Sequence, residues 1–402
     1  MQAKLTLFTL SLFLCFIANA QEWTPLNSGT TKELTDVFFI NESKGWAVGQ
    51  QGTILTTNDG GTNWAAQTSP VTSTGFTSVF FTSPTKGWVV GGKQSILTTD
   101  DGGNTWLAID SGNQINYEDV FFVTPDTGYI AGSNGVPGIV KRTTNGGASW
   151  QTVAAPSKGI YAMHFLSGTR GWAVGSRGLV VYTDDAGASW TEQVAAGSVS
   201  TLNLICLQML SETEGWAGGN PSAFKITANG STWTDKASGT NAGKHDVHFT
   251  DSQNGWAVVS SSFGNDQPLR KTTNGGTTWT MDTLHTATPN ALFFLNDTLG
   301  WAVGANGLVV RHGTPNIVIQ PSAVTYLNEA SLQLYPNPAG NYLNITCNEA
   351  IIKVEVFNLN GQLVLTPQAT ATIDVSPLAA GSYLIKLTTA TNHTALKRFG
   401  KM

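Results

Sequence analysis

The residues that could bind or transform a ligand are acidic, aromatic and basic side chains close to short apolar runs. Two carboxylates across a cleft can act as acid and base in glycoside hydrolysis, and aromatic rings beside carboxylates suit sugar stacking or protein contact. The candidates are Tyr117, Glu118, Asp119, Tyr161, Arg177, His245, Asp246, Phe263 and Asp266. Each could equally cap a loop or carry a solvated charge. Their positions in the fold must decide between these interpretations.

Other kinds of chemistry lack the residues that they need. The chain has 402 residues and a formal net charge of −5, so it offers no basic field for nucleic acid. It contains 3 Cys and no Cys-x-x-Cys or Cys/His cluster, and we expect no metal site. The Gly-x-Ser-x-Gly, His-Glu-x-x-His and phosphate-loop patterns are also absent, and we expect no cofactor.

The elements that must position the candidates come from one unit repeated along the chain. A Gly-Trp pair occurs six times, and Gly128-Tyr129 fills the gap in the series. The pairs begin at Gly45, Gly87, Gly171, Gly215, Gly255 and Gly300. Their spacing of 40 to 45 residues is typical of a four-stranded propeller blade. The sequence therefore predicts an all-β fold, a seven-bladed β-propeller.

A second landmark follows the pairs, with the pattern Thr-x-Asp/Asn-x-Gly-x-x-Trp. The short Asp or Asn side chain can accept hydrogen bonds from turn N–H groups, Gly supplies a positive φ, and Trp packs beyond the turn. We therefore expect a structural role for Asp59, Asp101, Asn145, Asp185, Asn229 and Asn274. The copy at Asn229 is one residue short. These turns resemble the Asp-box of the bacterial neuraminidase repeat (BNR).

An apolar run starts eight residues before each pair, as in VFFI from Val37 and VFFV from Val120. Continuous apolarity predicts an inner strand that is buried on both faces. His164 and His248 stand in these runs where four other repeats have Phe, which favours buried histidines over catalytic ones.

The count of tryptophans predicts how the ring closes. The last repeat has no box Trp after it, and Trp23 has no box before it. We therefore expect residues Trp23 to Ser28 to supply the outer strand of the last blade, which would remove exposed sheet edges.

The candidate residues fall on the loops that build the entrance face of a propeller. That face combines the loops before each inner strand with the loops after each Gly-Trp strand. Arg177 lies in the entrance loop of the fourth blade, and Phe263 and Asp266 lie in an insertion of the sixth. A departure from the repeat template on this face indicates a binding position.

The N-terminus is typical of a secretory signal. Lys4 precedes an apolar run from Leu5 to Ile17, and Ala18-Asn19-Ala20 forms a small-x-small cleavage site. We expect a signal peptide over residues 1–20 and no transmembrane segment, since the run is short of the roughly 20 residues that a crossing needs.

The C-terminal segment, residues 331–402, has no Trp and differs from the repeats. Alternating apolar residues on both sides of Asn360-Gly361 predict a hairpin, and the segment as a whole predicts a small β-sandwich. Residues 314–330, polar and with two prolines, would be the linker that follows a propeller over residues 21–313.

Two families resemble parts of this pattern. The series D-V-F-F, G-W-A-V-G and T-x-D-G-G-x-x-W, from about Glu22 to Gly313, is similar to the photosystem II stability/assembly factor family of seven-bladed propellers. In photosynthetic organisms that resemblance implies a lumenal chaperone. The segment with Tyr335-Pro336-Asn337-Pro338, Phe357-x-x-x-Gly361 and Gly381-x-Tyr383 resembles the C-terminal sorting domain of the type IX (Por) secretion system of Bacteroidota.

The sorting-domain resemblance implies passage through the periplasm and across the outer membrane, with the type IX machinery as a partner. The mature protein would then be secreted or held at the cell surface. Because this lineage has no photosystems, the assembly-factor role is the less favoured interpretation. We expect a module that binds an unknown extracellular protein or polysaccharide. The alternative is a glycoside hydrolase or lyase on the same face, with Glu118 or Asp119 and Asp246 as its carboxylates.

Overall fold

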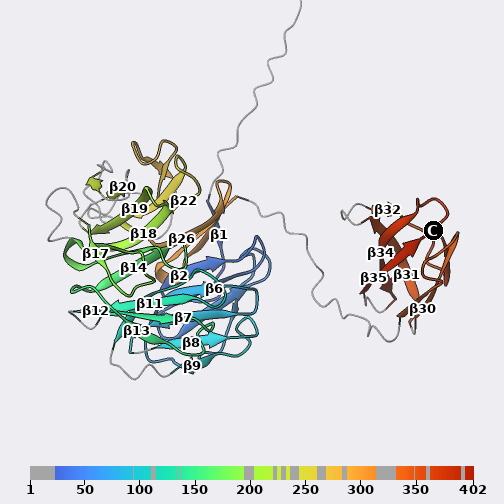
Figure 1. Cartoon of the computed structure of the whole chain (residues 1–402), viewed down its shortest axis with the longest axis horizontal. Helices are drawn as coiled ribbons and strands as arrows, with labels where there is room; N and C mark the ends of the chain where they lie inside the picture. Colours follow the sequence, from blue (N-terminus) through green and yellow to red (C-terminus); the bar gives the residue numbers. More distant parts are fainter. Residues whose placement is uncertain are drawn as a thin grey trace, which may run out of the picture. The chain divides into compact units, whose positions relative to one another are not determined.

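The computed structural model describes residues 23–93, 95–109, 115–133, 135, 137–193, 203–220, 224–227, 232–235, 244–259, 269–282, 288–313, 332–347, 349–358, 363–390 and 394–402. The chain divides into two compact units, Met1–Ile317 and Val318–Met402, and each is described by itself (Figure 1). The expected signal peptide, the expected linker and the Asn360-Gly361 turn lie outside the described residues. Within the described ranges, no helix is long and apolar enough to span a bilayer.

The first unit is the seven-bladed β-propeller that the repeat predicts. Its described residues form seven antiparallel sheets of four strands each. The inner strands are β2 (Leu34–Phe39), β6 (Phe76–Phe81), β10 (Asn116–Phe122), β14 (Ile160–Phe165), β18 (Asn203–Ser211), β22 (Lys244–Phe249) and β26 (Pro289–Asn296). The second strands, with the Gly-Trp pairs, are β3 (Gly45–Gly49), β7 (Gly87–Gly91), β11 (Gly128–Ser133), β15 (Gly171–Gly175), β19 (Glu214–Asn220), β23 (Gly255–Val259) and β27 (Leu299–Gly304).

The outer half of each blade is a third and a fourth strand. The third strands are β4 (Thr53–Thr57), β8 (Ile96–Thr99), β12 (Gly138–Thr143), β16 (Val180–Thr183), β20 (Phe224–Thr227), β24 (Leu269–Thr272) and β28 (Val309–His312). The fourth strands are β5 (Ala65–Ala66), β9 (Leu107–Ile109), β13 (Gln151–Val153), β17 (Thr191–Glu192), β21 (Trp233–Asp235) and β25 (Thr280–Asp282), with β1 (Trp23–Leu26) completing the last blade.

The Gly-Trp pair joins each blade to the next. Its first residue is a glycine because a side chain there would collide with an aromatic ring. The Phe39 ring lies on Gly45, where a Cβ would come within 2.5 Å of the ring. The other face of that ring stacks on Trp301 of the preceding blade, with centroids 3.5 Å apart and an angle of 7° between the planes. Trp46 stacks in the same way on Phe81 of the following blade, at 3.4 Å. A side chain in place of the glycine would displace the ring that the neighbouring Trp needs.

The ring closes as the sequence predicts. Strand β1 pairs antiparallel with β28, and Trp23 lies opposite His312. The Trp23 ring is 6% exposed and packs edge-on against Phe294, with centroids 5.8 Å apart. Its Nε1–H donates to Oδ2 of Asp282 in the sixth blade at 3.0 Å. The first strand of the chain thereby fastens the last blade to its neighbour.

The inner strands are not buried on both faces, so that prediction was wrong. Along β2, Val37 and Phe39 are buried, whereas Phe38 is half-buried. One face of the strand packs into the blade, and the other faces the ring axis. There Phe38 is covered by its counterparts Phe80 and Phe293 in the two adjacent blades, at centroid distances of 5.0 and 5.2 Å. A continuous apolar run therefore reflects aromatic contact around the axis, not a second packed layer.

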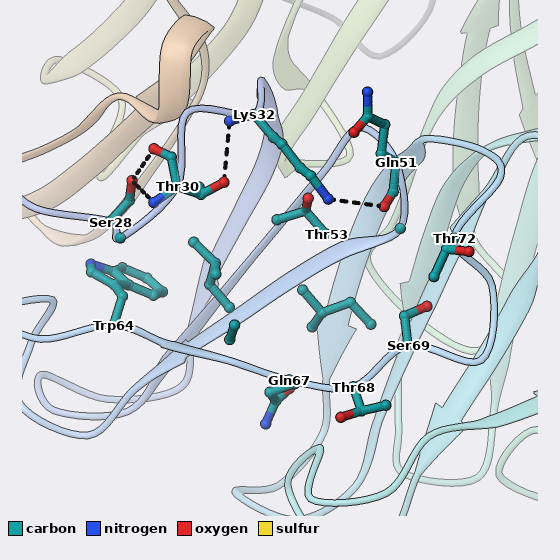
Figure 2. A pocket seen from close by; sticks show the side chains of 15 residues that line it. Ser28, Thr30, Lys32, Gln51, Thr53, Trp64, Gln67, Thr68, Ser69 and Thr72 are labelled. Atoms are coloured by element: carbon teal, nitrogen blue, oxygen red, sulfur yellow. Dashed lines mark hydrogen bonds between the residues drawn. The ribbon is translucent and has the colours of Figure 1, made fainter.

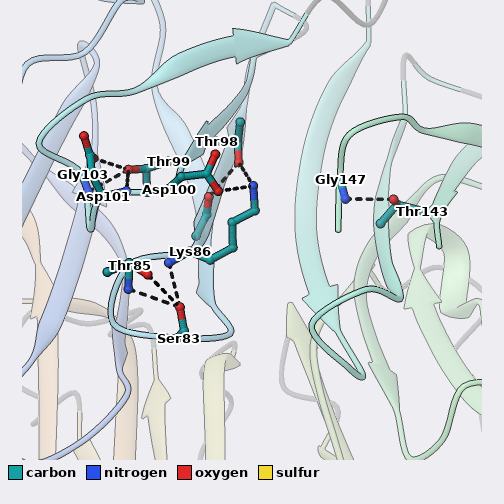
Figure 3. A network of polar contacts seen from close by, with 11 residues as sticks. Ser83, Thr85, Lys86, Thr98, Thr99, Asp100, Asp101, Gly103, Thr143 and Gly147 are labelled. Carbon is teal, nitrogen blue, oxygen red and sulfur yellow. Dashed lines mark hydrogen bonds and ion pairs between the residues drawn. The ribbon is translucent and has the colours of Figure 1, made fainter. Parts of the chain in front are cut away.

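The Asp-box residues hold their own turns (Figure 3). Oδ1 of Asp101 accepts the Thr99 hydroxyl at 2.8 Å and the Thr105 N–H at 2.9 Å, and Oδ2 accepts the Thr105 hydroxyl at 2.7 Å. These hydrogen bonds, led by those from Thr105, lower the pKa of Asp101 to about 2. Asp59, Asn145, Asp185 and Asn274 make the same set of contacts with the residue four positions later. Asn229 lies outside the described residues.

The second unit contains two small sheets with one core between them. One sheet has the order β29 (Leu332–Tyr335), β30 (Tyr342–Cys347) and β33 (Thr372–Asp374). The other has the order β32 (Leu363–Leu365), β31 (Ile351–Asn358), β34 (Gly381–Thr389) and β35 (Thr394–Lys401). Leu343 of the first sheet and Val356 and Ile385 of the second are fully buried in that core. This is the small all-β domain that the sequence predicts.

Candidate binding site on the ring axis

Each inner strand begins with a β-bulge, and the bulge decides which side chains face the axis. The pairing of β10 with β11 shifts register between Tyr117 and Asp119, so Glu118 is the extra residue. A bulge re-aims the side chain that it inserts. The described inner strands all shift at this position, and the inserted residues are Thr35, Thr77, Glu118, Tyr161, Ile205, His245 and Asn290.

The residues after the bulges form a second ring, and three of them are aspartates that join neighbouring blades. Oδ2 of Asp36 accepts the Val79 N–H of the next inner strand at 2.8 Å. Oδ2 of Asp119 accepts the Met163 N–H at 2.7 Å, and Oδ2 of Asp246 accepts the Leu292 N–H at 2.8 Å. Each carboxylate therefore satisfies a backbone donor on the adjacent blade while facing the axis.

The two rings enclose a cavity of about 250 Å³, which we call the axial cavity. All seven blades contribute to its wall. Its carboxylates are Asp36, Glu118, Asp119 and Asp246, and no Lys or Arg is among the lining residues that the structure describes. Phe121 and His164, whose ring centroids are 4.9 Å apart, also line the cavity and belong to the aromatic layer around the axis that includes Phe38 and Phe80. The cavity wall thus combines four carboxylates with aromatic side chains.

Burial and mutual repulsion raise the pKa values of these acids. Burial is the main cause for Asp246, whose pKa rises to about 7, with a further increase from the charge of Asp119. Burial likewise raises the pKa of Asp119 to about 6. The pKa of Asp36 is raised well above its usual value by burial, opposed by the N–H groups of Val79 and Val37, and that of Glu118 is raised by burial and by Asp119. A cation in the cavity would relieve this repulsion.

The two histidines of the aromatic layer are half-buried, not fully buried as the sequence predicts. Nδ1 of His164 accepts the Met209 N–H at 3.3 Å, and burial lowers the pKa of this imidazole to about 4. Burial also lowers the pKa of His248 to about 4, with a smaller contribution from His164. Both side chains are therefore neutral near pH 7 and add no positive charge to the cavity.

The structure brings some of the predicted site residues together and separates others. Glu118, Asp119, Tyr161 and Asp246 line the axial cavity. Tyr117 does not, because the residue before the bulge turns inward, and its ring is fully buried among Trp88, Val120 and neighbouring core residues.

The remaining predicted residues lie elsewhere. Arg177 is exposed on the turn after β15, with a left-handed φ of 54°, and is not part of the cavity wall. The backbone of His245 occupies the bulge of β22, and its side chain is outside the described part of the chain. Phe263 and Asp266 also lie outside the described residues.

Sequence reasoning missed Asp36, although a signal was present. Asp36-Val37, Asp119-Val120 and Asp246-Val247 are the same dipeptide at the same point of three repeats. Aligning the repeats one residue further upstream would have identified all three. In the ranges that the structure describes, no group of three or more His, Cys, Asp or Glu side chains is arranged to hold a metal ion.

Known proteins match both units. Residues 16–76, 69–159 and 148–239, together more than half of the chain, match the family described as photosynthesis system II assembly factor YCF48. The chain belongs to this YCF48 family. Its residues 333–399 match the secretion system C-terminal sorting domain, which implies type IX export to the cell surface or the extracellular space.

YCF48 proteins are also similar to this chain in sequence and in structure. The photosystem II assembly lipoprotein Ycf48 of Synechococcus sp. (strain CC9902) is 27% identical over 162 residues, which is 39% of this chain and 47% of that protein. The chain thus spans about half of that relative. A YCF48 structure bound to a D1 peptide has a TM-score of 0.60 at 21% identity and covers 73% of this chain and 97% of its own. YCF48 from Cyanidioschyzon merolae has a TM-score of 0.60 at 20% identity and covers 74% and 100%. At these identities the two structures show the fold.

Proposed function

We propose that this YCF48-family propeller acts outside the outer membrane as a protein-binding module, and that a cationic side chain of its partner enters the axial cavity. The sorting domain supports the location. The observation that carries the binding proposal is the set of four carboxylates around a 250 Å³ cavity, with no Lys or Arg among its described lining residues. A lysine or arginine side chain fits such a cavity in size and charge and would form charge-assisted hydrogen bonds there.

Glu118 is the carboxylate best placed to meet a ligand. The three aspartates already accept backbone N–H groups that hold the blades together. Within the described part of the chain, no hydrogen bond uses the Glu118 carboxylate, which lies on the bulge and is half-buried. A similar YCF48 structure contains a bound D1 peptide, and this supports a protein as the ligand of the present chain.

The proposal is tested with small cationic probes. N-acetyl-arginine amide and N-acetyl-lysine amide are titrated into the propeller, with N-acetyl-glutamine amide as the neutral control. We expect weak saturable binding of the cations alone and a severalfold loss in Glu118→Gln, because a charged partner of the hydrogen bond is removed. Equal binding of the neutral probe, or no effect of Glu118→Gln on a protein with an unchanged melt, would reject the cavity as a cation site.

Binding of the cationic probes should also depend on pH. The carboxylates must be ionised to attract a cation, and the pKa values of Asp119 and Asp246 lie at about 6 and about 7. Affinity is therefore expected to fall as the pH is lowered from 8 to 5. An affinity that is flat across this range would contradict the electrostatic basis of the proposal.

A glycoside hydrolase or lyase remains the competing hypothesis, since Glu118, Asp119 and Asp246 do line one cavity. It is separated from the binding proposal by incubating the propeller with polysaccharides and measuring reducing ends. Sustained release that disappears in Glu118→Gln or Asp246→Asn would establish the enzyme. The binding proposal predicts no release above that of the boiled protein.

A further inference from the structure

A second hollow lies away from the ring axis, where the ring is closed. It has a volume of about 390 Å³ and shares no residue with the axial cavity. Three segments of the first blade and of the closing strand's loop build it: residues 28–32, residues 51–55 and residues 64–72. We call it the rim hollow (Figure 2). Its volume is within the range of pockets that hold small ligands.

The local backbone explains why a hollow forms here. Gln51 and Gly52 adopt left-handed conformations, with φ of 55° and 68°, and turn the chain between β3 and β4. The Gly52 N–H donates to the carbonyl of Thr74 at 2.7 Å, which ties this turn to the loop that leads to the second blade. A Cβ at Gly52 would collide with the Val71 carbonyl. The segment from Gln67 to Thr74 is therefore held against the turn at Gly52, and its residues form one wall of the hollow.

Several polar groups in the wall are already used to build it. The Ser28 hydroxyl donates to the Gly307 carbonyl at 2.6 Å, and the Ser69 hydroxyl donates to the Val71 carbonyl at 2.6 Å. The Gln67 amide donates to the Gly102 carbonyl and accepts the Trp106 indole N–H, at 3.0 and 3.1 Å. These contacts fix the shape of the hollow in the absence of a ligand.

Other polar groups are left available. The hydrogen bonds of the described residues do not use the side-chain amide of Gln51 or the hydroxyls of Thr68 and Thr72. Figure 2 shows Trp64 at one end of the hollow and Thr72 at the other, whereas the Gln51 amide points away from the other lining groups. The Nε1 of Trp64 is buried, and the ring is half-buried, so the ring offers an apolar surface to the hollow.

The charge of the rim hollow is opposite to that of the axial cavity. Among the described residues that line it, none is Asp or Glu, and Lys32 is the charged one. The Lys32 ammonium group lies 3.5 Å from the Gln51 carbonyl, and it forms no ion pair with the described residues. The wall therefore offers one apolar ring, neutral donors and acceptors, and one positive charge.

We propose that the rim hollow is a second binding site, which takes a single sugar residue that bears a carboxylate. A hexuronate has a C–H face that can lie against Trp64 and hydroxyl groups that suit Thr68 and Thr72. Its carboxylate pairs with the ammonium group of Lys32 in a charge-assisted hydrogen bond. This site goes beyond the proposed protein-binding function, because it is separate from the axial cavity and selects the opposite charge.

The test uses the full chain with sodium glucuronate and glucose as probes, and saturation-transfer NMR with titration as the readout. We expect saturation of the glucuronate C–H protons and millimolar binding, with glucose bound several times more weakly. Lys32→Gln should reduce the glucuronate affinity to that of glucose, and Thr68→Val with Thr72→Val should weaken both sugars. Because Lys32 is exposed, its replacement is expected to leave the thermal melt unchanged.

The matched control is Lys93→Gln. Lys93 occupies the position in the second blade that Gln51 has in the first, with a φ of 51°. Its replacement by Gln removes the same charge from a neighbouring part of the surface. It should leave glucuronate binding unaltered. The proposal is overturned if glucuronate shows no saturation transfer, if glucose binds equally well, or if Lys93→Gln weakens binding as much as Lys32→Gln. None of these results depends on whether cationic probes bind in the axial cavity.

Discussion

Three aspartates next to the bulges combine structural and electrostatic roles. Asp36, Asp119 and Asp246 each accept an N–H group from the next inner strand, so removing the side chain would leave a buried donor unsatisfied, at a cost of about 1–3 kcal/mol. Their charges repel one another across the axial cavity. The same carboxylates therefore hold the blades together and make the centre of the ring acidic.

The first prediction concerns stability as a function of pH. The pKa of Asp246 is about 7 in the folded protein and 3.8 without the fold, so the folded state binds this proton more tightly than the unfolded state. The penalty for the ionised form is fully present above pH 7 and is lost as the pH falls toward 4. Lowering the pH from 8 to 5, about two units below the folded pKa, is therefore expected to raise the free energy of unfolding by roughly 2–3 kcal/mol for Asp246.

Asp246→Asn isolates this contribution. The amide oxygen can still accept the Leu292 N–H, but the group no longer titrates. Denaturant unfolding at pH 8, 6.5 and 5 should show a smaller pH dependence for the variant than for the wild type. Equal slopes would mean that Asp246 does not titrate in this range.

Among the elements, the Asp-box turns tolerate some substitutions better than others. Asn145 and Asn274 contact the same turn positions as Asp101 does. Their amide nitrogen donates to the Ser or Thr hydroxyl, whereas Oδ2 of Asp101 accepts from the Thr105 hydroxyl. We therefore expect Asp101→Asn to fold with a nearly unchanged melting temperature. Asp101→Ala, which loses the acceptor of the Thr105 N–H, should melt a few degrees lower. Equal melts for the two variants would contradict the structural role of the carboxylate.

The closing strand makes a larger contribution. Trp23→Ala removes a 6% exposed ring and should destabilise the propeller by about 3–5 kcal/mol. Deleting residues 21–30, which removes β1 altogether, should lower the melting temperature further. Thr24→Ala, at an exposed position of the same strand, is the control and should stay within about 0.5 kcal/mol of the wild type. A deletion variant that melts like the wild type would disprove the closure.

The elements show how far sequence alone can predict this structure. Regular Gly-Trp spacing and the unmatched Trp23 were sufficient for the ring and its closure, because they reflect the stacking that joins blades. The bulges were not predictable, because apolar alternation does not reveal which residue is inserted. As a result Tyr117, predicted at the site, is buried in the core, and Asp36, one residue from a predicted apolar run, was missed. Candidate residues could be located to the correct strand end, but their orientation depended on the inserted residue.

At the scale of the whole molecule, the sorting domain makes a prediction about export. Removing residues 331–402 should trap the protein in the periplasm, because the type IX machinery would lack its signal. Fractionation of cells that carry the full and the truncated gene measures this, with a periplasmic marker to exclude lysis. Appearance of the truncated protein in the medium at the normal level would overturn the assignment of this unit as the export signal.

The pairing of Trp23 with His312 joins positions 289 residues apart. In a chain that enters a compartment with its N-terminus first, β1 enters first and its partner strand β28 enters after all the other strands of the propeller. No partly delivered chain can hold a finished ring, and the axial cavity, to whose wall every blade contributes, is incomplete without the seventh blade. The proposed binding of a cationic side chain at this centre therefore requires the complete propeller.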